Sequence, residues 1–168
     1  MAFTARDARY AGLSTGLLVL FVGAYVLATL PDGARAAAPD FELPTVDGGT
    51  TRIVATDGRV TVVEFFSTKC EPCERVQASM QELRAERGDG IRFLSVGVDP
   101  TDGFDELVAY GQQKALPWPM AMGDAAVLEA FGIQVFAHVV VIDADGGIVR
   151  VLTGTPDVEA LRAAVGAA

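Results

Sequence analysis

The chain has 168 residues, which is about the length of one domain, and its only two cysteines lie three positions apart. It carries 22 acidic against 13 basic residues, a formal net charge of −9 at pH 7. This acidic surplus argues against nucleic acid as a partner, because surfaces that bind phosphates are basic.

Residues 11–30 form an uncharged apolar stretch near the N-terminus. At ~1.5 Å rise per residue, a helix of this length matches the ~30 Å hydrocarbon thickness of a bilayer. Arg6 and Arg9 precede the stretch and Asp32 follows it, so the positive-inside bias places the N-terminus in the cytoplasm. We therefore expect a cytoplasmic N-terminus at 1–10, a single-pass transmembrane anchor in the cell membrane at 11–30, a tether at 31–38 and an extracytoplasmic domain at 39–168.

A cleaved signal peptide is the alternative interpretation of this N-terminal segment. The small residues at 34–38 offer an Ala-x-Ala-like cleavage site, and cleavage there would release a secreted domain. The apolar region of a signal peptide usually has about 7–15 residues, so the length of 11–30 favours a retained anchor.

The first half of the domain alternates extended and helical patterns. Residues 45–54 contain an Asp-Gly turn between two short extended stretches, which predicts a hairpin. The β-branched and aromatic run at 60–66 predicts a strand buried on both faces. A helix is predicted from Cys70 to Gly88, with apolar residues at helical spacing and a proline in its first turn.

The second half completes an α/β pattern. The predicted elements are a strand at 91–98, a helix at 104–111, a short strand at 120–122, a short helix at 125–131, a hairpin of strands at 138–142 and 148–152, and a closing amphipathic helix at 156–165. This order predicts an α/β fold with a central sheet covered by helices on both faces.

The two cysteines, Cys70 and Cys73, lie where the buried strand turns into a helix. Unpaired N–H groups and the helix dipole stabilise an anion there, which lowers a thiol pKa from ~8.5 into the range ~3.5–7.5. Cys70 is therefore the expected nucleophile, and Cys73, one turn later and more buried, the thiol that resolves a mixed disulfide. Structural zinc would need four ligands, which one histidine and two cysteines do not supply. A purely structural disulfide across so small a loop would restrain the unfolded chain very little.

Three stretches carry a family resemblance: APDFELP at 38–44, VVEFFSTKCEPC at 62–73 and VVIDADGGIV at 140–149. They resemble the extracytoplasmic thioredoxin-like proteins related to TlpA and ResA. The resemblance implies a thioredoxin-like fold with a central mixed sheet, an added N-terminal hairpin and an insertion within 99–123. It also implies a thiol–disulfide oxidoreductase that needs no cofactor beyond its redox-active Cys70–Cys73 disulfide. Its partners would be disulfides of client proteins, in cytochrome c or copper-site assembly, and a transmembrane electron donor.

The residues around the dithiol suggest further roles. Glu64 lies six residues before Cys70, where thioredoxins have a buried aspartate, and a buried carboxyl with a raised pKa could accept the proton of Cys73. The alternative for Glu64 is an edge-facing or salt-bridged strand residue. Lys69 replaces the tryptophan common in the family, and either stabilises the thiolate and attracts acidic clients or solvates an exposed turn. Glu71 and Pro72 are expected to tune the reduction potential.

The chain departs from the family pattern at 135–138, where the family has a cis-proline followed by threonine. Ala137 takes the proline position. A cis bond before a non-proline residue costs roughly 3 kcal/mol, so a trans peptide bond before Ala137 is an open alternative. His138 takes the next position, near which Cys70 is expected. His138 is therefore a hydrogen-bonded strand residue, a group that tunes the thiolate, or a metal ligand.

Copper binding and peroxidase activity are two alternatives to disulfide exchange. Two thiolates and an imidazole suit Cu(I), so a Sco-like copper chaperone using Cys70, Cys73 and His138 is the alternative function. Sco-type proteins have three residues between their cysteines and a differently placed histidine, which makes the match incomplete. Peroxiredoxins need a threonine and a proline where this chain has Ser67 and Val63, which disfavours a peroxidase.

Overall fold

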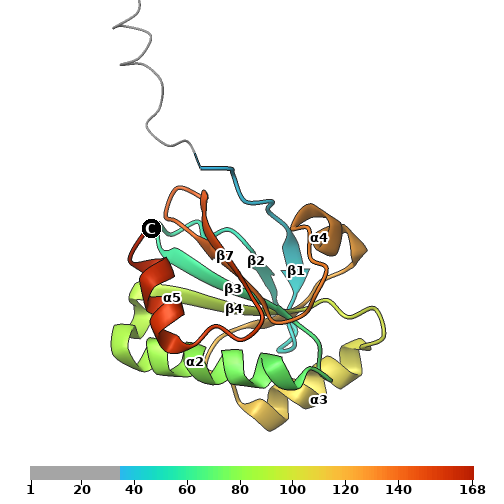
Figure 1. Ribbon diagram of the computed structural model, residues 1–168. Coiled ribbons are helices and arrows are strands. Elements are labelled where there is room, and N and C mark those ends of the chain that lie inside the picture. Colours follow the sequence, from blue (N-terminus) through green and yellow to red (C-terminus); the bar gives the residue numbers. More distant parts are fainter. Residues whose placement is uncertain (1–34) are drawn as a thin grey trace, which may run out of the picture. The chain divides into compact units, whose positions relative to one another are not determined.

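The computed structural model describes residues 35–168 (Figure 1). The predicted cytoplasmic segment at 1–10, the anchor at 11–30 and residues 31–34 of the tether lie outside this range. From residue 35 onward, the structure contains no helix that is long and apolar enough to cross a membrane.

A five-stranded mixed sheet forms the centre of the domain, with the strand order β5-β4-β3-β6-β7. The central strand β3 pairs parallel with β4 and antiparallel with β6. The strands are β3 (Val60–Phe66), β4 (Ile91–Gly97), β5 (Met120–Met122), β6 (His138–Ile142) and β7 (Ile148–Thr153). This sheet confirms the predicted strands and their α/β arrangement.

Helices cover both faces of the sheet, as the sequence predicts. The helices are α2 (Glu71–Arg87), α3 (Phe104–Lys114), α4 (Ala125–Ala130) and α5 (Val158–Val165), and a 3₁₀ turn, η1 (Gly88–Gly90), follows α2. In Figure 1, α2, α3 and α5 lie below the sheet, and α4 lies on the other side. Alternate residues of β3 enter the two cores: Val62 and Phe66 pack under α2 and α5, whereas Val63 and Phe65 pack toward α4.

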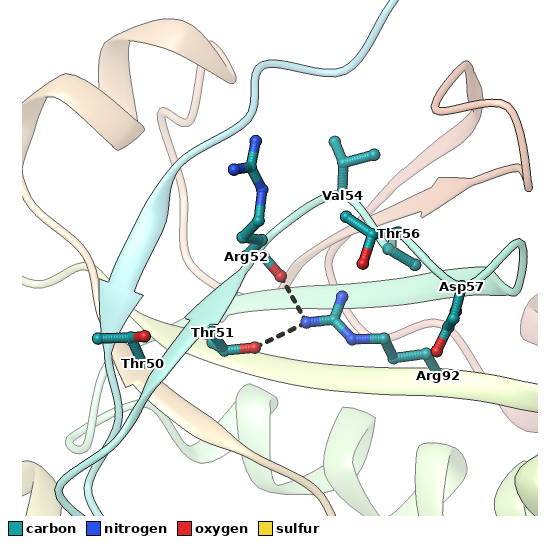
Figure 2. A pocket seen from close by; sticks show the side chains of 8 residues that line it. Thr50, Thr51, Arg52, Val54, Thr56, Asp57 and Arg92 are labelled. Atoms are coloured by element: carbon teal, nitrogen blue, oxygen red, sulfur yellow. Dashed lines mark hydrogen bonds between the residues drawn. The ribbon is translucent and has the colours of Figure 1, made fainter.

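The predicted N-terminal hairpin is present as β1 (Glu42–Pro44) and β2 (Thr50–Arg52), with Gly48 at φ 87° in its turn, but its first strand precedes the predicted range 45–54. The hairpin continues to the β5 edge, where the Val46 N–H donates to the Met120 carbonyl at 3.0 Å. A hollow of about 250 Å³ lies beside β2. Figure 2 shows its lining, in which Arg92 of β4 donates to the Thr51 hydroxyl and the Arg52 carbonyl. These hydrogen bonds from Arg92 stabilise the position of the hairpin on the sheet.

The described chain enters at the end of the sheet opposite the dithiol. The Ala38 N–H donates to the Gly146 carbonyl in the turn between β6 and β7. Register pairs Ile142, at the end of β6, with Thr61 at the start of β3. The cysteines follow the other end of β3, so residues 35–38 and the dithiol lie at opposite ends of this strand.

Candidate functional site

The two cysteines form a disulfide at the start of α2, with their Cα atoms 5.3 Å apart. Cys70 is the N-cap residue in an extended conformation, so its side chain faces the first free N–H groups of the helix. Its Sγ accepts a hydrogen bond from the Cys73 N–H at 3.2 Å. Cys70 is partly exposed and Cys73 is fully buried. An incoming disulfide can therefore reach Cys70 more easily than Cys73.

Glu71 and Pro72, between the cysteines, occupy the first turn of α2. The Glu71 carboxylate is exposed and forms an ion pair with Arg75 one turn later. The proline lacks an N–H group and loses no helical hydrogen bond there. Both positions agree with the expected helix start, and their effect on the reduction potential stays a prediction.

Two aspartates in the segment after β4 accept hydrogen bonds from the loop that leads to Cys70. Because β3 and β4 are parallel, their C-terminal ends lie side by side. Asp102 accepts hydrogen bonds from the Thr68 N–H at 2.7 Å and the Thr68 hydroxyl at 2.8 Å. Asp99 accepts one from the Ser67 hydroxyl at 2.8 Å. Neither aspartate is recognisable from the sequence as part of this site, since nothing in their spacing indicates contact with residues more than thirty positions earlier.

Lys69 lies immediately before Cys70 but its ammonium group is directed to other residues. Its Nζ is 3.0 Å from Asp102 Oδ1 and bonds the Thr101 carbonyl at 3.2 Å. The hydrogen bond to Asp102 raises the pKa of Lys69. This geometry favours a role in the exposed turn over stabilisation of the thiolate.

Glu64 lies in the middle of the central strand and is completely buried. Its Oε2 accepts hydrogen bonds from Gln77 Nε2 at 3.1 Å and Ser95 Oγ at 2.9 Å. Burial raises the pKa of Glu64 from 4.5 to about 8, although these two donors act in the opposite direction. Glu64 is not at a sheet edge, and within 35–168 it forms no salt bridge.

A second pair of side chains supports the partners of Glu64. The Tyr110 hydroxyl donates to Gln77 Oε1 at 2.8 Å, and the Trp118 indole N–H donates to Ser95 Oγ at 3.0 Å. Trp118 is recognisable in the sequence as a loop-packing residue, whereas nothing in the pattern marks Gln77, Ser95 or Tyr110. The four come from α2, β4, α3 and the loop before β5 and meet only in the folded chain.

Ala137 packs in the same hydrophobic cluster as Cys73 and is 1% exposed. It has a left-handed backbone conformation at φ 57°, which is unusual for a residue with a Cβ atom. All peptide bonds of the described residues are trans, including the one before Ala137.

His138 lies on the other face of the sheet. It pairs with Phe65 in the β3–β6 register, and the two ring centroids are 6.2 Å apart. The imidazole is buried, neither ring nitrogen has a partner among residues 35–168, and burial lowers its pKa. In the same part of the chain, no three histidine, cysteine or acidic side chains gather as a metal site. The structure thus places His138 in a strand, without the expected hydrogen bonds and apart from the cysteines.

Comparisons with known proteins agree with this site. The AhpC/TSA family model matches residues 34–151. The thiol-disulfide oxidoreductase ResA of Geobacillus thermodenitrificans is 28% identical over 130 residues, which cover 76% of this chain and 73% of that protein. The thioredoxin-like protein YneN of Bacillus subtilis is 23% identical over 119 residues, 70% of each chain.

Solved structures share the fold. A thiol:disulfide interchange protein of the thioredoxin family from Chlorobium tepidum superimposes with a TM-score of 0.70 at 24% identity, over 81% of this chain and 97% of its own. StoA from Bacillus subtilis gives 0.64 at 17% identity, over 77% and 98%. The domain therefore has the thioredoxin-like α/β fold that the sequence resemblance implies.

Proposed function

This chain belongs to the AhpC/TSA family, and from that membership and the geometry of its dithiol we propose that it is a thiol–disulfide oxidoreductase. The observation that carries the proposal is the hydrogen bond from the Cys73 N–H to Cys70 Sγ at the start of α2. The same N–H would stabilise the Cys70 thiolate after reduction, and only the thiolate attacks disulfides. Ser67 and Val63, which replace the threonine and proline of peroxiredoxins, argue against a peroxidase within this family.

The reaction proceeds in two exchange steps. The Cys70 thiolate attacks one sulfur of a client disulfide, so that a mixed disulfide forms and the other client sulfur leaves as a thiolate, which takes up a proton. Cys73 then gives its proton to Glu64 and attacks Cys70 Sγ. The mixed disulfide breaks, the second client sulfur leaves as a thiolate that takes up a proton from solvent, and the Cys70–Cys73 disulfide remains with the proton on Glu64. Two electrons have passed from the dithiol to the client.

Glu64 suits the proton transfer because a pKa of about 8 lies close to that of an ordinary thiol. A carboxylate at its usual pKa would be a much weaker base. Glu64, Cys73 and Ala137 are all buried, so bulk solvent does not reach these side chains directly. This burial favours a base supplied by the protein for the second step, and Glu64 is the proposed one.

Reduction of client disulfides, with clients in cytochrome c or copper-site assembly and a transmembrane electron donor, is our more specific proposal. The ResA relatives, which are named thiol-disulfide oxidoreductases, support exchange but do not fix its direction. The reduction potential tests the direction: roughly −270 mV or below supports a reductant, and about −120 mV would indicate an oxidant.

A membrane anchor at 11–30 with an extracytoplasmic domain completes the proposal. It is supported by the length and flanking charges of that segment. Fractionation with N-terminal mass analysis tests it. An intact chain that stays with membranes after an alkaline wash supports the anchor, whereas a soluble chain beginning near 34–38 would indicate a cleaved signal peptide.

A further inference from the structure

We propose that four polar side chains around Glu64 are positioning residues that keep Oε2 as a hydrogen-bond acceptor and leave Oε1 to exchange the proton. They are Gln77, Ser95, Tyr110 and Trp118. This inference rests on the proposed function, in which Glu64 accepts the proton of Cys73. In the reaction described above, each of the four acts through its hydrogen bonds to Glu64 or to a partner of Glu64.

The direction of one hydrogen-bond chain follows from Trp118. An indole N–H can only donate, so Ser95 Oγ is the acceptor of the 3.0 Å bond between them. A hydroxyl has a single hydrogen, and that of Ser95 is then available for Glu64 Oε2, at 2.9 Å. Trp118 therefore directs the Ser95 hydroxyl toward the carboxyl group.

The second hydrogen-bond chain also runs toward Glu64. The Tyr110 hydroxyl donates to Gln77 Oε1 at 2.8 Å, which fixes the oxygen side of the amide group on Tyr110. The amide nitrogen then faces Glu64 Oε2 at 3.1 Å. Tyr110 is itself held in place, because its ring packs 5.4 Å from that of Phe66 between centroids. Gln77 lies one turn after Cys73 on α2. The same helix therefore carries the proposed resolving cysteine and a hydrogen-bond donor to Glu64, its proposed base.

Both hydrogen-bond chains end on Oε2 of Glu64. Oε2 receives two donors in either protonation state, whereas Oε1 is buried and has no hydrogen-bond partner in the described part of the chain. A proton on Oε1 breaks neither bond, but a proton on Oε2 would compete with two donors. The two chains thus hold the carboxyl group in one orientation while its charge changes.

Few other titratable groups act on Glu64. Cys73 on α2 and Tyr110 on α3 pack on its side of the sheet, and Glu74 and Lys114 form an ion pair beyond Tyr110. On β6, Glu64 pairs with Val139, and the neighbouring His138 faces the opposite side. The donors on Oε2 are therefore the main feature that favours the charged carboxylate against burial.

Tyr110→Phe and Trp118→Phe test the proposal in the full chain in detergent micelles. Each change removes one distant donor and keeps an aromatic ring. The titration of Glu64 is followed by NMR of a chain labelled with ¹³C at the glutamate carboxyl carbon, and Glu64→Gln identifies the signal. We expect the midpoint to rise by about one pH unit in both variants, because a released Gln77 or Ser95 no longer favours the charged form.

Thr61→Val is the matched control. Thr61 lies on the same strand, is completely buried, and its hydroxyl has no partner within 35–168. Removing this hydroxyl should leave the Glu64 midpoint unchanged. If Tyr110→Phe and Trp118→Phe also leave it unchanged while both variants retain the wild-type melting temperature, the positioning role is wrong.

A kinetic measurement separates this inference from the proposed function. In both variants the pH profile for decay of the mixed disulfide should shift with the Glu64 midpoint, whereas the pH profile for alkylation of Cys70 should not. Shifted midpoints in a protein without disulfide exchange would support the network and refute the enzyme. If both variants keep the wild-type pH profile for decay of the mixed disulfide, the positioning role is wrong, whereas the proposed disulfide exchange stands.

Discussion

The sulfur atom of Cys70 lies 3.2 Å from the backbone nitrogen of Cys73 and accepts its hydrogen bond at the first turn of α2. One cysteine thus occupies the helix N-cap, and the other supplies one of the N–H groups that would stabilise its anion. This relationship gives the two cysteines unequal roles, which substitutions can distinguish.

Cys73→Ser should trap a mixed disulfide with a model disulfide substrate, because the buried resolving thiol is missing. Cys70→Ser should form none, since its remaining thiol is completely buried. Non-reducing electrophoresis and mass spectrometry measure the adducts. Equal adduct formation by the two variants would show that the burial of Cys73 does not assign the roles.

The raised pKa of Glu64 makes stability depend on pH. The group binds its proton more tightly in the folded state, so its contribution is fully present below pH 4.5 and is lost as pH rises through about 8. The loss amounts to about 5 kcal/mol. Glu64→Gln should remove this dependence. Urea denaturation at pH 5 and pH 9 compares the variant with wild type and with Thr61→Val, which should behave as wild type; equal losses in all three proteins would refute the prediction.

His138 should make the stability of the protein depend on pH in the acidic range. Burial lowers its pKa below 6.5, so the stability that the neutral imidazole contributes is present above pH 6.5 and is lost as pH falls toward the folded-state pKa. His138→Leu should reduce the loss of melting temperature between pH 6.5 and pH 5 relative to wild type. An unchanged acid loss in the variant would mean that the imidazole gains a partner on protonation.

Asp102 should matter for stability although it lies outside the dithiol motif. It is buried and accepts two hydrogen bonds from Thr68, besides its ion pair with Lys69. Asp102→Ala leaves the Thr68 N–H without its partner and should lower the free energy of unfolding by about 1–3 kcal/mol. The exposed Asp105 provides the control, since Asp105→Ala should change stability by less than about 0.5 kcal/mol. Equal effects of both changes would contradict the assigned role.

Local patterns were sufficient to predict the main elements and the dithiol. The run at β3 is apolar on both faces, and Pro72 marks the helix start, so strand, turn and N-cap cysteine follow from neighbouring residues. The burial of Glu64 followed from the same strand pattern. The extension of α3 from Gly111, where the prediction ended, to Lys114 was not indicated, because its last turn is polar.

Contacts between distant elements were not predictable. Trp118 is recognisable in the sequence only as a loop residue between two prolines, and its bond to Ser95 exists because β4 and β5 are adjacent. The side of the sheet on which His138 lies depends on its register with Phe65. A shift of one residue would have turned it toward the cysteines.

The ionisation of Cys70 tests the central claim most directly. Its rate of alkylation is measured against pH in a reduced Cys73→Ala chain, with Lys69→Gln in the same background as the control for the neighbouring charge. We predict a midpoint between roughly pH 3.5 and 7.5, which Lys69→Gln leaves nearly unchanged because Asp102 already binds that ammonium group. A midpoint of about 8.5, as for a free cysteine, would contradict the account.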